Sequence, residues 1–259
     1  MDPIQAPTVD LQTAADELGV HYQTAYRWVR TGRLNAEMIG GKYVVSESDL
    51  VEFDRSRRAP TAPPPPKRVR LEHAADRMHA ALIAGDETAA TRISHRLAEE
   101  GAPITDLIQE VLVPPLQRIG QQWQNGELTI WAEHRASAIV ERLLGELASN
   151  PRGRRRGVAV VAALADDRHS LPTTMAAVAL RDDNWHVHHL GADLPPEQLR
   201  QFCETNDVNL AVITVTNPDV DQQALATADE LRAGGTPTIV GGRGQSLDRL
   251  LEQARSAAQ

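Results

Sequence analysis

A histidine in a short polar turn is the residue of this sequence best placed to bind a ligand. The turn carries Asp167, Arg168 and His169, and it follows the apolar segment 158–164, VAVVAAL, which predicts a buried strand. A helix is predicted directly after the turn. In open α/β sheets, ligands bind at the carboxyl ends of the parallel strands, where such a turn lies. His169 is therefore either a ligand-binding residue or an ordinary loop histidine.

The segments around this turn alternate between strands and helices, which predicts a parallel sheet with helices on both faces. The further predicted strands are 185–190, 210–215 and 237–240, and the predicted helices are 170–180, 195–204, 221–233 and 246–257. The turns after these strands carry Gly191-Ala192-Asp193, then Thr214 to Asn217, and then Gly241-Gly242-Arg243-Gly244. We expect all these turns on one edge of the sheet, because parallel strands end on the same side.

Three more histidines, His186, His188 and His189, fall in the second predicted strand. The alternating polarity of this strand indicates a more exposed position in the sheet. We therefore interpret these histidines as part of an exposed strand edge rather than as a metal site.

The preceding segment, 70–150, is predicted to form a four-helix bundle with breaks at Gly85, Gly101 and Asn125-Gly126. Two consecutive prolines, 114 and 115, fall inside its third helix and are expected to kink it.

One end of this bundle is expected to carry three side chains that could form a site. Trp123 ends the third helix, and Glu133 and His134 begin the fourth, so the short loop between them brings the three together. Taken alone, this arrangement also fits a core tryptophan beside a Glu-His pair that caps a helix.

The first segment, 1–58, has the pattern of a winged helix-turn-helix. Two short helices, at 11–18 and 21–32, are joined by a turn that contains glycine. Gly40 and Gly41, between alternating apolar residues, predict a tight hairpin, and a third helix is expected directly after it.

Charge is distributed unevenly along the 259 residues. Residues 1–70 hold ten Lys/Arg and nine Asp/Glu, a net of +1, whereas the remainder has a net charge of −9. Any contact with DNA phosphates therefore belongs to the first segment, because the rest would repel them. The segment 59–69 is rich in proline and is interpreted as a semi-rigid linker, with an SH3-type ligand as the alternative.

Composition also limits the compartment and the kind of site. Cys203 is the only cysteine of the chain, which excludes an intramolecular disulfide and a cysteine-based zinc site. No segment is apolar over the length needed to cross a bilayer, and the stretch 1–12 lacks the basic and apolar regions of a signal peptide. We therefore expect a cytoplasmic protein with no membrane partner.

The order of helix, turn, helix, Gly-Arg-Leu and Gly-Gly hairpin closely resembles the winged helix-turn-helix of the MerR and excisionase families. The resemblance implies that the second helix enters the major groove of DNA. The residues expected to face base edges or phosphates are Gln23, Thr24 and Arg27, and those expected to hold the DNA backbone are Arg30, Arg33 and Lys42. The alternative is a small helical protein-interaction domain with a solvated charged face.

The spacing of Trp123 and Glu133-His134 resembles the helical cap of cobalamin-binding modules, and more narrowly that of cobalamin-dependent MerR regulators of the CarH and LitR type. The later turns resemble the Rossmann-like cobalamin-binding domain, whose pattern is Asp-x-His-x-x-Gly, then Ser-x-Leu, then Gly-Gly. This resemblance implies adenosylcobalamin as the cofactor, with His169 replacing dimethylbenzimidazole beneath the cobalt and Asp167 accepting the other ring N–H. The implied cofactor-binding residues are Trp123, Glu133 and His134 above the corrin, Asp167 and His169 below it, and Thr214, Gly241 and Gly242 beside the nucleotide tail.

Three positions depart from the patterns of these families. Pro172 stands in place of the motif glycine, and Thr216 stands in place of the leucine. Gln124 follows Trp123, where light-sensing members carry a second histidine that can ligate cobalt. A domain that kept the fold and lost the cofactor is the alternative.

Together these features predict a multidomain chain: an α-helical winged helix-turn-helix at 1–58, a linker at 59–69, a four-helix bundle at 70–150 and a Rossmann-like α/β cobalamin-binding domain at 154–259. The resemblance implies a transcriptional repressor whose oligomeric state and promoter binding are controlled by adenosylcobalamin and by light. Self-association, as a homotetramer, is expected to place several DNA-binding domains on promoter DNA. Enzymatic activity is not expected, since the assigned segments leave no room for a separate substrate barrel.

Overall fold

The computed structural model describes residues 7–30, 32–58, 67–147 and 153–257. The chain divides into two compact units, Met1–Pro65 and Pro66–Gln259, and each is described by itself. Most of the predicted linker lies outside the described residues. Across the described residues, none of the helices has the length and apolar character that a bilayer crossing requires.

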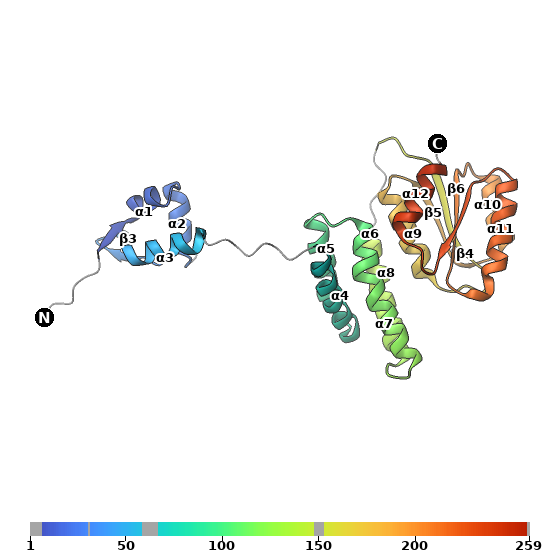
Figure 1. Cartoon of the computed structure of the whole chain (residues 1–259), viewed down its shortest axis with the longest axis horizontal. Coiled ribbons are helices and arrows are strands. Elements are labelled where there is room, and N and C mark those ends of the chain that lie inside the picture. The colour runs from blue at the N-terminus through green and yellow to red at the C-terminus, as the bar shows by residue number, and fades with distance from the viewer. Residues whose placement is uncertain (1–6, 31, 59–66, 148–152, 258–259) are drawn as a thin grey trace. The chain divides into compact units, whose positions relative to one another are not determined.

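The first unit combines short helices with a three-stranded antiparallel sheet (Figure 1). Its elements are β1 Thr8–Asp10, α1 Leu11–Glu17, α2 Tyr22–Arg30, β2 Glu37–Ile39, β3 Lys42–Ser46 and α3 Glu47–Arg58. The strand order is β1-β3-β2. The helices and the hairpin confirm the sequence prediction. β1 is not predicted from its local pattern, because pairing with β3 is what makes it a strand.

Local chemistry explains where these elements begin and turn. Asp10 Oδ1 accepts a hydrogen bond from the backbone N–H of Thr13 (2.7 Å), which caps α1. Gly40 and Gly41 have φ of 58° and 80°, and they form the two-residue turn between β2 and β3. The buried Trp28 belongs to the core that joins the helices to the sheet.

The second unit begins with the predicted helical bundle. Its elements are α4 Lys67–Ala84, α5 Glu87–Glu99, α6 Ile104–Asp106, the π-helical segment η1 Leu107–Leu112, α7 Val113–Gln124 and α8 Ile130–Leu147. α6, η1 and α7 follow one another without a break and make up the predicted third helix. The Val113 N–H bonds to the carbonyl of Ile108, five residues back, and Pro114 and Pro115 fall in the first turn of α7. A change from π-helical to α-helical hydrogen bonding therefore lies directly before the prolines, at the place where the sequence predicts a kink.

The rest of the second unit is an α/β domain. Its elements are β4 Val158–Leu164, α9 Ser170–Asp182, β5 His186–Leu194, α10 Pro196–Thr205, β6 Leu210–Val215, the 3-10 segment η2 Pro218–Val220, α11 Asp221–Ala233, β7 Thr238–Gly242 and α12 Leu247–Ala257. The strands form a parallel sheet in the order β5-β4-β6-β7. Apolar residues of α9 and α12 pack on one face of the sheet, and those of α10 and α11 pack on the other (Figure 1). The predicted sheet with helices on both faces is confirmed.

The bundle and the α/β domain of the second unit share a core. Met175 and Val178 of α9 belong to the apolar cluster of the bundle. Gln109, in the π-helical segment, adds polar contacts. Its Oε1 accepts a hydrogen bond from the Leu247 N–H (2.6 Å), and its Nε2 donates to the Asp248 carboxylate (3.1 Å). Leu247 is the first residue of α12, so Gln109 satisfies one of the N–H groups that a helix start leaves unpaired.

Replacing Gln109 by Ala is expected to lower the free energy of unfolding by about 1–2 kcal/mol, because the Leu247 N–H loses a part-buried acceptor. Chemical denaturation followed by circular dichroism measures the change. The matched control is Gln121→Ala, which removes an exposed contact with Asn125 and is expected to change stability by less than about 0.5 kcal/mol. Equal losses in the two variants would contradict the capping role of Gln109.

Candidate functional site

The buried carboxylate of Asp167 organises the turn that follows β4. Its Oδ1 lies 2.8 Å from His169 Nδ1, and its Oδ2 accepts hydrogen bonds from the backbone N–H groups of Thr216 (2.5 Å) and Asn217 (3.1 Å). Asp167 is fully buried, whereas the His169 side chain is 60% exposed. An ionised carboxylate only accepts hydrogen bonds, so Nδ1 carries the proton and Nε2 is the ring nitrogen that can ligate a metal.

The surroundings of Asp167 favour its charged form. Burial alone would raise the pKa of this carboxyl, but the hydrogen bonds from Thr216, the His169 ring and Asn217 outweigh burial and hold the pKa below its ordinary value. The ionised carboxylate orients the imidazole and strengthens it as a metal ligand.

Asp193 and Asn217 fix the backbone of this turn through Asp166. Asp166 has a φ of 72°, which is uncommon for a residue other than glycine. Its N–H donates to Asp193 Oδ1 (2.8 Å), and its carbonyl accepts from Asn217 Nδ2 (3.2 Å). The sequence places Asp193 and Asn217 in turns at this edge but gives neither a role, because the role of each depends on contacts between turns.

Pro172, which replaces the motif glycine, fits the observed backbone. It is the third residue of α9, and His169 occupies the N-cap position of that helix. The N–H groups in the first turn of a helix have no partner within the helix, so a proline there loses no hydrogen bond. The residue of this turn with positive φ is Asp166 rather than Pro172.

Thr214, Gly241 and Gly242 lie on neighbouring strands, with Thr214 opposite Gly241 and Val215 opposite Gly242. The Thr214 hydroxyl is buried and has no hydrogen-bond partner in the described part of the chain. A Cβ added to Gly241 would approach Gln245 Oε1 at 3.8 Å and no other atom within 4 Å. A buried hydroxyl without a partner, beside a glycine with open space around it, fits a slot that receives a polar ligand group.

The three bundle residues of the predicted site lie at the end of α7 and the start of α8. Trp123 is 42% exposed, which excludes the alternative of a core tryptophan. Glu133 Oε1 accepts a hydrogen bond from Ser137 Oγ (2.8 Å), and its Oε2 lies 3.6 Å from His134 Nε2. Within the described residues, no hydrogen bond, ion pair or ring contact joins these three side chains to His169. The upper and lower halves of the predicted site are thus not in direct contact.

The three histidines of β5 lie on an edge strand that is more exposed than the central strands β4 and β6, as predicted, and each of the three is half-buried. The ring centroids of His186 and His188 are 4.9 Å apart. His189 Nε2 lies 2.8 Å from Thr173 Oγ1, and because the Thr173 hydroxyl donates to the Ser170 carbonyl, His189 is the donor of this pair. Among the residues that the structure describes, no group of three or more His, Cys, Asp or Glu could hold a metal ion.

The residues expected to contact DNA gather on α2 and around the hairpin of the first unit. The exposed members are Gln23, Arg27, Arg30, Arg33 and Lys42, and Thr24 is half-buried. The three tyrosines of the chain, which the motif does not include, lie among these residues. The ring of Tyr26 contacts both Tyr22, with centroids 6.3 Å apart, and Tyr43, with centroids 5.9 Å apart. One feature of the sequence could have identified two of these tyrosines: the spacing of Tyr22 and Tyr26 puts both on one face of a helix.

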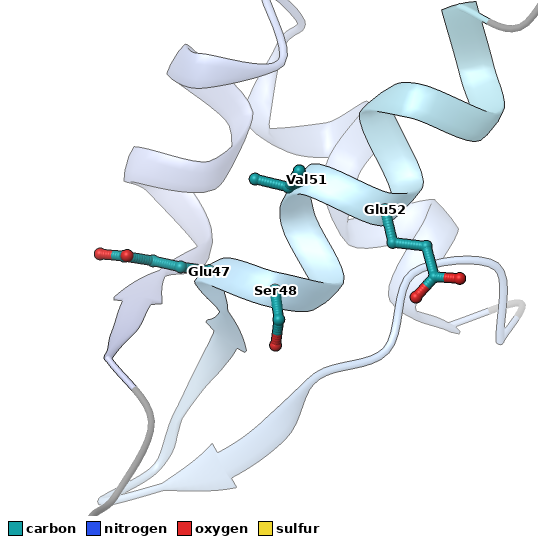
Figure 2. Close-up of a pocket in the computed structure, with 4 residues that line it drawn as sticks. All are labelled: Glu47, Ser48, Val51 and Glu52. Carbon is teal, nitrogen blue, oxygen red and sulfur yellow. The ribbon is translucent and has the colours of Figure 1, made fainter.

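Figure 2 shows a surface hollow on α3 that does not belong to the predicted DNA face. Its lining side chains, Glu47, Ser48, Val51 and Glu52, project from this one helix. Two of the four are carboxylates, which repel DNA phosphates.

Gly242 is required by the backbone, because its φ is 138° and an added Cβ would lie 2.0 Å from the Val215 carbonyl oxygen. We expect Gly242→Ala to lower the free energy of unfolding by at least about 2 kcal/mol. Gly241→Ala adds a Cβ without a close neighbour and is expected to change stability by less than about 1 kcal/mol. Chemical denaturation of both variants measures the difference, and similar losses would show that the close approach at Gly242 is relieved by movement.

The lowered pKa of Asp167 predicts a pH-dependent stability. Its contribution is fully present above the ordinary pKa of 3.8 and is lost as the pH falls through the lower folded-state value. Asp167→Asn is expected to reduce the free energy of unfolding by about 1–3 kcal/mol at neutral pH, and this difference from the native protein should shrink below about pH 4. The control is Asp229→Asn, an exposed carboxylate paired with Arg232. A difference of equal size at neutral and acidic pH would argue against an ionised Asp167.

Three family models match this chain. A helix-turn-helix domain model matches residues 8–58, and two B12 binding domain models match residues 74–148 and 157–258. Among the curated proteins similar to it is the HTH-type transcriptional repressor CarH of Myxococcus xanthus, 31% identical over 157 residues, which are 58% of this chain and 52% of that protein. The chain thus spans about half the length of this relative.

Among the solved structures, the monomethylamine corrinoid protein of Methanosarcina barkeri has a similar fold. Its TM-score is 0.54 at 17% identity, with 72% of this chain and 95% of that chain covered. At this identity the likeness concerns the fold alone. By the family matches, a helix-turn-helix domain and two B12 binding domains follow one another in this chain, and the repressor CarH is a relative of it.

Proposed function

We propose that this protein is a DNA-binding transcriptional regulator, a repressor, that is controlled by cobalamin. The observation that carries the proposal is the Asp167–His169 pair at the carboxyl edge of the sheet, in a chain that also has a helix-turn-helix domain. Promoter DNA binds to the first unit and cobalamin to the second. The protein acts in the cytoplasm as a regulator and not as an enzyme.

The residues of the second unit fit a cobalamin in three respects. His169 offers Nε2 to the cobalt, and Asp167 holds the ring. The buried Thr214 hydroxyl and the open side of Gly241 fit the nucleotide tail. Trp123 offers an exposed aromatic face to the adenosyl group. When bound, adenosylcobalamin supplies a cobalt–carbon bond that light can break.

Control of DNA binding requires that the cofactor favour one oligomeric state over another. Residues 1–70 carry a net charge of only +1, so a single copy should bind DNA weakly, and a useful affinity requires several copies on one promoter. We propose that adenosylcobalamin favours a homotetramer. Trp123, Glu133 and His134 would line the face of the corrin that carries the adenosyl group, and tetramer formation and DNA binding would depend on that group being present.

Gln124 bears on the response to light. It stands where light-sensing relatives have a histidine, and a side-chain amide is a poorer cobalt ligand than imidazole. The light response that we propose therefore ends with dissociation of the tetramer and needs no second histidine ligand.

The second candidate is a regulator that has lost cobalamin and senses another small molecule or a partner protein. The sequence favours this candidate at two positions, because Pro172 replaces the glycine and Thr216 replaces the leucine of the cobalamin-binding pattern. In the structure, Pro172 lies in the first turn of α9, and Thr216 acts on Asp167 through its backbone N–H, which any residue except proline provides. Both substitutions therefore leave the backbone of the turn and the contacts of Asp167 in place, which supports the first candidate.

The test is to purify the full chain with adenosylcobalamin in darkness and to record its absorption spectrum, its mass by light scattering and its retention of promoter fragments before and after green light. We expect bound corrin and DNA retention in darkness, and a lower mass with loss of DNA after light. Protein without bound corrin would overturn the proposal in favour of the second candidate. Bound corrin with an unchanged mass would leave a cobalamin sensor and reject the light switch.

His169→Ala is expected to lower the affinity for adenosylcobalamin at least about tenfold, because the lower ligand is lost. Equilibrium dialysis followed by absorption spectroscopy measures the bound corrin. His186→Ala, on the edge strand β5, is the matched control and should bind corrin as the native protein does. If both variants bind equally well, His169 is not the lower ligand.

A further inference from the structure

The carboxyl edge of the sheet carries many carboxylates and few cations. At the strand ends and in the turns that follow them, the acidic residues are Asp166, Asp167, Asp193, Asp219 and Asp221, and the arginines are Arg168 and Arg243. The nucleotide tail of a cobalamin contains a phosphodiester, which is an anion at neutral pH. An anion at this edge needs a cation beside it to offset the repulsion from the carboxylates.

Arg243 lies at the end of the slot formed by Thr214 and Gly241. It directly follows Gly242, and its backbone N–H donates to the Val215 carbonyl (3.2 Å), one residue beyond Thr214 on β6. Its side chain is held at this edge by Asp221, the first residue of α11. Toward the carboxyl ends of β6 and β7, the buried hydroxyl of Thr214 lies beside Gly241, Gly242 follows, and Arg243 comes directly after it.

We propose that Arg243 binds the phosphodiester of the nucleotide tail and so selects complete cobalamins over corrinoids without the tail. This inference rests on the proposed cobalamin function of the second unit. A tail whose base end lies beside the Thr214 hydroxyl must pass the strand ends on its way to the corrin, and Arg243 is the cation at that point. Guanidinium is suited to the task, because its planar N–H donors match the oxygens of a phosphate.

The geometry of the Arg243–Asp221 pair leaves donors available for such an anion. Only Nη2 contacts the carboxylate, at 3.0 Å from Oδ1 and 2.8 Å from Oδ2. The guanidinium also carries N–H groups on Nε and Nη1. Both side chains are about half exposed, at 47% and 51%, so an anion from solvent or ligand can approach. Asp221 then positions the guanidinium while the remaining donors face the phosphodiester.

Arg168 is less suited to this role. It belongs to the turn after β4 and pairs at 3.7 Å with Asp193 of β5. In the strand order β5-β4-β6-β7, β5 lies on the other side of β4 from the slot between β6 and β7. Its side chain is 83% exposed, which leaves it weakly positioned.

The test compares adenosylcobalamin with adenosylcobinamide, which has the same corrin ring and upper ligand but no nucleotide tail. Equilibrium dialysis of the full chain in darkness measures both affinities. We expect Arg243→Gln to weaken adenosylcobalamin binding about tenfold, because a charge-assisted hydrogen bond is lost, and to change adenosylcobinamide binding less than about twofold. Arg243→Lys keeps the charge without the planar donors and should recover part of the loss.

Two controls separate this effect from general damage. Arg200→Gln breaks a comparable exposed pair with Glu230 between α10 and α11, and Arg168→Gln removes the other arginine of the edge. Neither should discriminate between the two corrinoids. Equal weakening of both corrinoids by Arg243→Gln, or no weakening, would overturn the role of Arg243 while leaving cobalamin binding intact. Failure of the native protein to bind either corrinoid would instead reject the proposed function itself.

Discussion

The α/β domain contains a charged carboxylate with no access to water, and such a group is stable only where hydrogen bonds replace its hydration. For Asp167 these bonds come from the Thr216 and Asn217 N–H groups and from the His169 ring. The donors belong to the turn after β6 and to the N-cap residue of α9, so one carboxylate fixes two turns of the sheet edge. The orientation of His169 follows from the same contacts. The imidazole is therefore held in one orientation, with Nε2 free of the contact to Asp167, by interactions that also stabilise the fold.

The slot on the other side of the edge depends on strand register. Thr214 faces Gly241 and Val215 faces Gly242 because the central strand β6 is buried along its whole length, and burial on both faces fixes the pairing. A slip by one residue would remove the Thr214 hydroxyl from the open side of Gly241, and it would separate Gly242 from the Val215 carbonyl, whose close approach leaves no room for a Cβ at position 242. The position of the Thr214 hydroxyl beside Gly241 thus depends on the same register as the pairing of β6 with β7.

Much of this arrangement could be predicted from the sequence, because helix and strand periodicity are local signals. The helices of the bundle, the four parallel strands and the placement of Asp167, His169, Thr214 and Gly241 at strand ends are examples. What could not be predicted depends on contacts between distant segments. β1 exists only through pairing with β3, the half-buried state of His189 depends on α9, and Asn217 acts through the turn of another strand. The π-helical segment before the prolines likewise has no local pattern of its own.

The proposed function requires that a ligand held by the second unit control DNA binding by the first. A direct contact between the two units is not required. If the cofactor stabilises association of the second units, each added copy raises the effective concentration of a DNA-binding domain near the same promoter, and affinity multiplies without any change within that domain. Such a mechanism suits a DNA-binding unit of low net charge, since one copy alone stays weakly bound. Under the proposed function, the energy that distinguishes the two states must arise in the second unit, because the cofactor would bind there.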